Sequence, residues 1–125
     1  MATSLNRKVG EVAWQVLRTT IEGKDRAFRT SLKALCQSFP SCVHNNGLAL
    51  AVTFYRGKGD EHLHATYLTM LVACLQRGAG LQIQDDSQLE GHALRDRPLA
   101  FRDLNTTVLL AALWLKRMAE AECRD

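Results

Sequence analysis

Thiols are the first groups in this chain that could do chemistry. The 125 residues include four cysteines without a Cys-x-x-Cys pair, namely Cys36, Cys42, Cys74 and Cys123. A thiol enzyme that used Cys36 or Cys42 would need a base to generate the thiolate. No histidine stands at a spacing that predicts a Cys–His arrangement. We therefore expect reduced intracellular thiols that pack mostly as small hydrophobic side chains.

Histidines, carboxylates and glycines give no stronger signal for catalysis. His62 and His64 are two residues apart, so a helix would point them to opposite sides and they predict no metal site. Asp85 and Asp86 are adjacent, which suits a helix N-terminus better than a catalytic carboxylate pair. The Arg-Gly-Lys-Gly stretch at 56–59 lacks the spacing of a phosphate-binding loop. The sequence predicts a protein that is not an enzyme and has no metal, cofactor or small-molecule substrate.

Helical periodicity dominates the elements that carry these groups. Strand-like alternation is nearly absent and the chain has only 2 prolines. We therefore expect an all-α fold, a compact bundle of about five to six helices that forms one domain over residues 1–125. No stretch reaches the roughly 20 apolar residues of a transmembrane helix, and no signal peptide is recognised. The sequence predicts a soluble cytoplasmic protein that does not contact membranes.

The apolar pattern also predicts the individual helices. They are expected at about residues 5–22, from about residue 24, and at 60–76, 87–95 and 105–121. Asp60 and Asn105 are the expected caps of two of them. Pro40 fits the first turn of a further helix, and its apolar run at 48–55 predicts a central rod surrounded on all sides. Residues 81–103 are expected to be the most turn-like part, either mobile or facing a partner.

Three residues are candidates for contacts between subunits. Trp14 flanks the first helix, where a tryptophan is either the edge of the core or an anchor in an interface. Gly47 marks a kink, follows an Asn46 that caps a new helix, or lets another backbone approach closely. Trp114 lies in a helix that is apolar on nearly every side, like the 48–55 run. Either these two helices pack on each other as the core, or part of their surface is kept for a neighbouring subunit.

Basic residues gather at several places in a chain whose net charge is +3. Arg26, Arg29 and Lys33 recur three and four residues apart and form one ridge on a helix. This ridge is either a solvated face or a surface for phosphate groups, whose neutralisation releases counterions and drives binding. Arg56 and Lys58 suit a helix C-terminus and form a basic loop tip that could contact an RNA backbone.

Two stretches resemble a known family. The first covers residues 27–55 and reads AFRTSLKAL, then SFPSCVHNNGLALAVTFY. The second reads FRDLN at 101–105 and LWLKRMAEA at 113–121. In order and spacing they are similar to the small α-helical subunit of type III-B (Cmr-type) CRISPR RNA-guided effector complexes. Phe101, Asn105 and Met118 stand where the family pattern has tyrosine, threonine and phenylalanine, and residues 81–99 match no part of that pattern.

The resemblance implies a structural role. Small subunits of this family stack on copies of themselves into a minor filament, which lies beside the backbone subunits that hold the guide RNA. They help to line the channel in which guide RNA pairs with target RNA, and cleavage belongs to other subunits. We hypothesise that seven cations face this RNA: Arg26, Arg29, Lys33, Arg56, Lys58, Lys116 and Arg117. The last two match the family pattern and could instead serve subunit packing.

A stand-alone helical nucleic-acid binder or adaptor is the alternative function. A helix-turn-helix regulator would need an exposed recognition helix after a tight turn. The step at Asn46 and Gly47 is the candidate turn, but the helix that follows is too apolar to lie in a groove.

Overall fold

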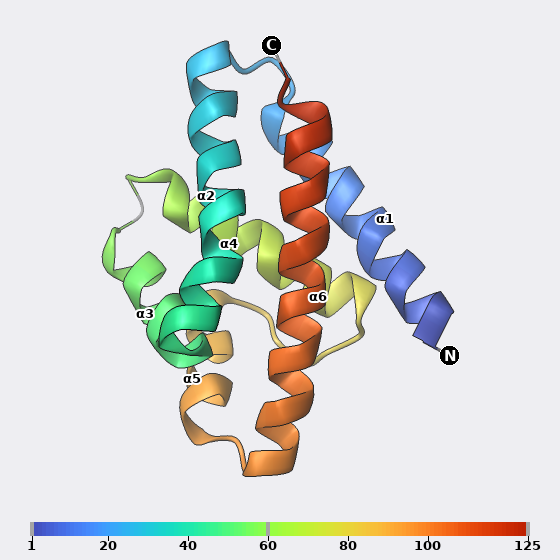
Figure 1. Cartoon of the computed structure of the whole chain (residues 1–125), viewed down its shortest axis with the longest axis vertical. Helices are drawn as coiled ribbons and strands as arrows, with labels where there is room; N and C mark the ends of the chain where they lie inside the picture. The colour runs from blue at the N-terminus through green and yellow to red at the C-terminus, as the bar shows by residue number, and fades with distance from the viewer. Residues whose placement is uncertain (1, 60, 125) are drawn as a thin grey trace.

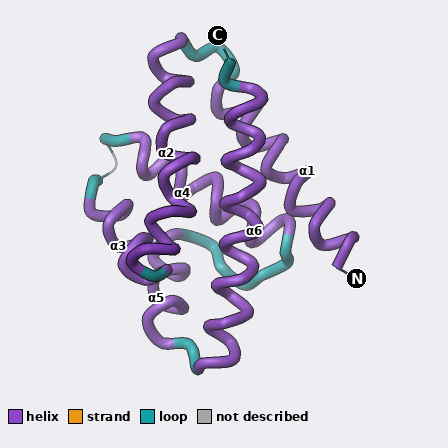
Figure 2. Tube along the Cα trace, viewed as in Figure 1, coloured by secondary structure: helices purple, strands orange, loops and turns teal. Residues whose placement is uncertain are grey.

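The computed structural model describes residues 2–59 and 61–124, with side chains from Leu5 onward. In this part of the chain the elements are all helical and no strand occurs (Figure 2). In chain order they are α1 (Ala2–Ile21), α2 (Arg26–Asn46), α3 (Leu48–Gly57), α4 (Leu63–Ala73), the π-helical turn η1 (Cys74–Gly78), α5 (Asp86–Arg95) and α6 (Pro98–Glu122). The prediction of a compact all-α bundle of five to six helices is confirmed.

The three longest helices form the frame of the molecule. α2 and α6 run antiparallel to each other, and α1 packs against α6 and η1 (Figure 1). α1 is amphipathic as its spacing predicts, because Val9, Val12, Ala13 and Leu17 are buried on one stripe. The frame therefore follows from apolar stripes that the sequence shows.

Two glycines let α1 approach its neighbours closely. A Cβ added at Gly10 would lie 2.8 Å from the Trp114 ring, and one at Gly78 would lie 2.9 Å from the Cα of Val9. Real Cβ atoms do not pack at such distances, so a side chain at either position would force the neighbouring atoms to shift. At Gly47 none of the described residues lies within 4 Å of an added Cβ. Gly47 lies between α2 and α3 and has a φ of 86°. Within this chain it therefore marks a break between two helices and not a close approach of two backbones.

α2 is longer than its sequence predicts. Pro40 lies inside α2 and does not begin a new helix, so that prediction is wrong. An interior proline removes one helical hydrogen bond and crowds the preceding turn, but Phe39 and Val43 on either side of it are buried. Tertiary packing has overridden the local signal. Asn46 is the last residue of α2, and Gly47 rather than Asn46 stands at the N-cap of α3.

α3 lies on the flank of the bundle rather than at its centre (Figure 1). One side of α3 packs on α2, α4 and α5, while Leu50 and Phe54 on the other side are 58% and 52% exposed. The prediction of a rod surrounded on all sides is therefore wrong. α3 and α6 do not form the core by packing on each other, because α6 packs mainly on α1 and α2.

The segment at 81–103 is more helical than predicted. α5 begins after Asp85, whose side chain accepts a hydrogen bond from the Gln88 N–H at 2.8 Å, so the helix expected here is confirmed. α6 starts at Pro98 and not at Asn105, because proline suits the first helical position. The predicted cap Asp60 lies outside the described residues.

The centre of the core is aromatic. The Phe39 ring lies 5.0 Å from the rings of Tyr55 and Tyr67, measured between centroids. The Tyr55 hydroxyl lies 2.8 Å from Ser38 Oγ and donates to the Leu35 carbonyl at 3.1 Å. The Tyr67 hydroxyl is buried and has no hydrogen-bond partner among the described residues. These rings join α2, α3 and α4 into one core.

Candidate nucleic-acid interface

The antiparallel packing of α2 and α6 brings five of the seven predicted cations to one end of the molecule. The first half of α2 and the second half of α6 lie beside one another there (Figure 1). Gln37 Nε2 on α2 donates to Glu120 Oε2 on α6 at 3.1 Å and ties the two helices together. The cations at this end are Arg26, Arg29 and Lys33 on α2, and Lys116 and Arg117 on α6.

The cations of α2 lie along the first half of that helix. Arg29 Nη1 donates to the Lys24 carbonyl at 2.5 Å, which leaves further N–H donors on the same guanidinium. Burial raises the pKa of Cys123, and the charges of Lys33 and Arg29 partly oppose that rise. Both cations therefore lie near the C-terminal end of α6. We call Arg26, Arg29 and Lys33 the α2 ridge.

A hollow of about 560 Å³ opens beside the α2 ridge, between the end of α1, the start of α2 and the end of α6. Its lining residues are Arg18, Thr19, Ile21, Glu22, Arg29, Glu122 and Arg124. Arg18 Nη1 lies 3.8 Å from Glu122 Oε1. Three guanidinium groups against two carboxylates leave the lining with an excess of positive charge, so the basic surface continues from the ridge across this end.

The cations of α6 lie near the carboxylate of Glu120. Arg117 Nη1 lies 3.0 Å from Glu120 Oε1, one turn along the helix. The hydrogen bond from Gln37, followed by that from Arg117, lowers the pKa of Glu120. Arg117 therefore has a partner within the chain, and the contact of Lys116 and Arg117 with RNA stays a prediction.

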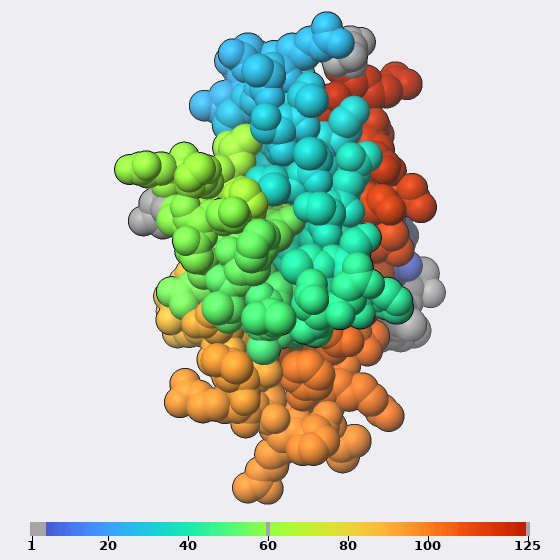
Figure 3. Space-filling model, turned by 60° about the vertical axis from the view of Figure 1, so that its left-hand side comes forward, coloured from blue at the N-terminus to red at the C-terminus, as the bar shows by residue number. Residues whose placement is uncertain are grey.

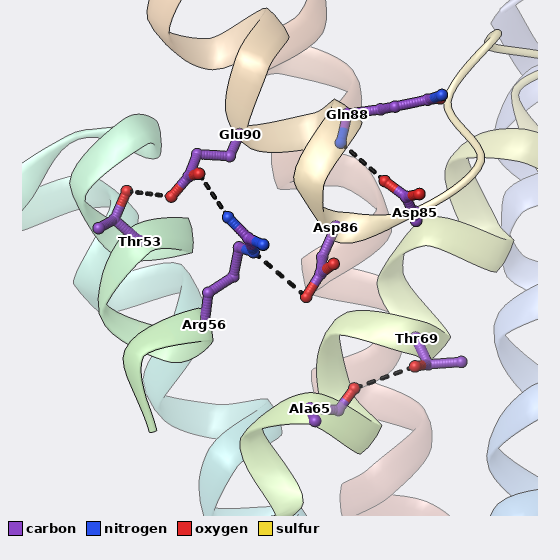
Figure 4. A network of polar contacts seen from close by, with 8 residues as sticks. All are labelled: Thr53, Arg56, Ala65, Thr69, Asp85, Asp86, Gln88 and Glu90. Atoms are coloured by element: carbon purple, nitrogen blue, oxygen red, sulfur yellow. Dashed lines mark hydrogen bonds and ion pairs between the residues drawn. The ribbon is translucent and has the colours of Figure 1, made fainter. Parts of the chain in front are cut away.

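Arg56 lies in the last turn of α3 and takes part in a network of polar contacts between α3 and α5 (Figure 4). Its Nη1 lies 2.5 Å from Glu90 Oε1 and its Nε lies 3.5 Å from Asp86 Oδ2. Thr53 Oγ1 donates to Glu90 Oε2 at 2.6 Å. The hydrogen bond from Thr53 is the largest influence that lowers the pKa of Glu90, and the Arg56 charge adds to it. Sequence reasoning missed this network, although Asp86 and Glu90 stand four residues apart on one helix face.

Lys58 is an exposed residue at the C-terminal end of α3. Its Nζ lies 4.8 Å from the centroid of the Phe54 ring, so the cation partly covers an exposed aromatic side chain. The structure does not bring Arg56 and Lys58 together with the α2 ridge, and their contact with RNA stays a prediction.

The two tryptophans have different environments. Trp14 is 42% exposed, and the guanidinium of Arg18 lies 5.0 Å from its ring centroid. Trp114 packs on Gly10 and donates from Nε1 to Asn6 Oδ1 at 2.7 Å. Trp114 therefore joins α1 to α6 within the chain, whereas Trp14 is partly exposed and partly covered by Arg18. Neither arrangement tests the prediction that these residues meet another subunit.

The buried thiols are poor nucleophiles. Burial is the main cause that raises the pKa of Cys36 and of Cys74 to about 12, so the reactive thiolate is scarce at neutral pH. Among residues 2–59 and 61–124, no group of three or more His, Cys, Asp or Glu side chains is arranged to hold a metal ion. Over the same residues, no helix has the length and apolar character needed to cross a membrane.

Comparisons with known proteins find a family and a solved structure that match nearly the whole chain. A family model described as CRISPR-associated protein (Cas_Cmr5) matches residues 5–122. The X-ray crystal structure of a CRISPR-associated Cmr5 family protein from Thermus thermophilus superposes with a TM-score of 0.77 at 24% sequence identity, over 94% of this chain and 96% of that chain. At that identity the likeness shows a shared fold. No curated protein sequence matches the chain significantly.

Proposed function

The chain belongs to the CRISPR-associated Cas_Cmr5 family, and from this premise we propose that it is a non-catalytic subunit that stacks into a minor filament and lines the guide–target RNA channel. The resemblance to the small subunit of type III-B (Cmr-type) CRISPR complexes is confirmed by the family match. Its proposed partners are the backbone subunit, further copies of itself, and the guide and target RNA. It would act in the cytoplasm as one domain of residues 1–125.

The α2 ridge is the observation that carries the RNA contact. Leu32, Cys36 and Phe39 form the buried stripe of α2, and the cations of the ridge occupy other positions of the same helix. Together with the hollow beside it, the ridge gives one end of the molecule an array of basic side chains. Such an array suits an RNA backbone, because each neutralised phosphate releases counterions. Arg56 contributes less to this proposal, since two carboxylates already balance its charge.

Exposed apolar side chains support contacts between copies. Leu94 and Leu99 flank the turn between α5 and α6 and are 65% and 72% exposed. This turn and the basic surface lie at opposite ends of the molecule (Figure 1). Because the two ends differ, end-to-end contacts between copies would be heterologous, and contacts of that kind propagate into filaments.

Charge reversal of the α2 ridge tests the RNA contact. We expect the assembled complex with Arg26, Arg29 and Lys33 changed to glutamate to bind target RNA more weakly. The slope of log affinity against log salt should fall by up to about 3 units, since each lost phosphate contact removes about 0.7–0.9. The matched control reverses Arg7 and Lys8, which are exposed cations on α1, and should leave the slope unchanged. An unchanged slope in the ridge variant would show that the ridge is a solvated face.

An RNase assay tests the absence of catalysis. The purified chain should leave target RNA intact under conditions in which the assembled complex cleaves it. Cleavage that is abolished by substituting Cys42, a half-buried thiol, would contradict a purely structural role.

A further inference from the structure

We propose that Trp14 and the hollow between α1, α2 and α6 form a binding site for an unpaired nucleotide of single-stranded RNA. The site rests on the proposed function, from which it takes RNA as the ligand. It adds a place where a base stacks, whereas the α2 ridge offers contacts to phosphates alone. Trp14 would hold the base, and the arginines of the hollow would hold the adjoining phosphates.

The geometry around Trp14 suits a flat ligand. Trp14 is 42% exposed, although a large aromatic side chain on an amphipathic helix usually packs inward. The Arg18 guanidinium lies 5.0 Å from the ring centroid and also lines the hollow. The guanidinium therefore lies over one face of the ring, at the edge of the hollow, and a base would stack on the guanidinium or take its place on the ring. Bases stack on aromatic rings and on guanidinium planes without regard to sequence.

The charge of the hollow suits phosphate. Arg18, Arg29 and Arg124 come from three different segments of the chain and meet around a volume of about 560 Å³. Glu22 and Glu122 also line the hollow, and Glu122 lies 3.8 Å from Arg18. The two carboxylates offset part of the positive charge, and the three arginines leave the lining with one positive charge in excess. A guanidinium fork matches the oxygens of a phosphate group.

The position of the hollow favours a chain of nucleotides over a free nucleotide. Arg29 belongs both to the hollow and to the α2 ridge. Lys33 stands one turn further along α2, so cations continue beyond the space that one nucleotide fills. RNA bound with one base on Trp14 would thus reach the ridge with its next phosphates. A paired base cannot stack in this way, so the site selects unpaired RNA.

A matched pair of oligomers, one with bases and one without, tests the site on the full-length chain. A short oligouridine and an abasic ribose-phosphate oligomer of the same length carry the same phosphates, and both are titrated at low salt. We expect the oligouridine to bind about tenfold more tightly, the effect of one stacked base. Only the oligouridine should quench tryptophan fluorescence. Trp14→Leu should remove the tenfold difference and the quenching, and Trp14→Phe should retain part of the difference.

The controls separate this site from the proposed function. Leu99→Ala removes an exposed apolar side chain at the other end and should leave both affinities unchanged. If the wild-type chain binds both oligomers equally, or Trp14→Leu keeps the difference, the stacking site is wrong while the RNA contact stands. If neither oligomer binds at low salt, the RNA contact itself is wrong.

Two further results would identify a different occupant. Full competition by uridine monophosphate at equal phosphate concentration would show a free-nucleotide site and overturn the RNA proposal. Loss of self-association in Trp14→Leu, measured by sedimentation, with unchanged RNA binding would place Trp14 in a protein interface and overturn the proposal as well.

Discussion

The seam between α1 and α6 and the seam between α3 and α5 are built on different principles. Gly10 faces the Trp114 ring at the first seam, where even a methyl group would overlap. Arg56, Glu90 and Thr53 join the second seam through polar contacts (Figure 4). The first seam depends on shape and the second on charge. Small volume changes should therefore matter most at the first seam, and charge neutralisation should matter most at the second.

The flank also carries part of the apolar surface that the fold leaves uncovered. Leu50 and Phe54 stand four residues apart on α3 and are both more than half exposed. The segments of α3 and the start of α4 lie together on the face shown in Figure 3. A helix with uncovered apolar residues and a polar seam has less apolar packing to hold it than the frame helices have.

Truncation of a frame residue should have the largest effect. Leu115 is fully buried in α6, whereas Leu113 on the same helix is 47% exposed. Leu115→Ala should lower the free energy of unfolding by about 2–5 kcal/mol through lost burial and the cavity it leaves. Leu113→Ala should lower it by less than about 1 kcal/mol. Urea denaturation measures both, and equal losses would show that the frame is not the packed part of the molecule.

A methyl group at Gly78 should have the next largest effect. The new Cβ would lie 2.9 Å from the Cα of Val9, and a backbone atom cannot turn aside as a side chain does. Gly78→Ala should therefore cost about 1–3 kcal/mol as an overpacked contact between α1 and η1. Gly57→Ala is the control, because none of the described residues lies within 4 Å of the added atom. Thermal unfolding that ranks Gly57→Ala as the more damaging change would contradict the shape-based seam.

Two tyrosines of the core should respond with opposite signs when each loses its hydroxyl. Tyr67→Phe should raise the free energy of unfolding by about 1 kcal/mol, because its buried hydroxyl has no partner among the described residues. Tyr55→Phe should lower it by about 1 kcal/mol, because its hydroxyl contacts Ser38 and Leu35. Chemical denaturation measures both changes. If they have the same sign, the hydrogen-bond partners of each hydroxyl do not determine its effect on the free energy of unfolding.

The polar seam should give the smallest effect and depend on pH. The folded-state pKa of Glu90 is below its ordinary value of 4.5, so its ion pair stabilises the fold above that pH. The contribution is lost as the pH falls through the folded pKa. At neutral pH Glu90→Gln should cost less than about 1 kcal/mol. The difference from wild type should shrink as the pH falls below 4.5 and vanish below the folded-state pKa, and a difference that persists in stronger acid would contradict an ionic seam.

Sequence patterns predict the fold class well because helix faces are local. The buried stripe of α1 and the cap at Asp85 are both visible as spacing and residue type. Pro40 and Pro98 are harder, since each is compatible with a helix start and tertiary packing decides which one begins a helix. The sequence drew attention to Gly47, yet the close approaches occur at other glycines. The residues next to a glycine in the sequence do not show which part of the fold it packs against.

The candidate site shows the same limit. The spacing of Arg26, Arg29 and Lys33 predicts a ridge, because one helix face is a local property. The partners of Arg56 are the carboxylates of α5, some thirty residues away along the chain. The hollow next to Trp14 is formed by three segments that only the antiparallel packing of the frame brings together. Such arrangements depend on how distant helices pack, and the periodicity of a sequence does not predict them.

Crosslinking within the assembled complex tests the central claim most directly. Target RNA that carries photoreactive uridines would be irradiated in the complex, and the attached peptides of this subunit would be mapped by mass spectrometry. We predict crosslinks in peptides that contain Trp14 or residues 26–33, at the basic end of the molecule. Crosslinks confined to the turn between α5 and α6, at the opposite end, would contradict the account.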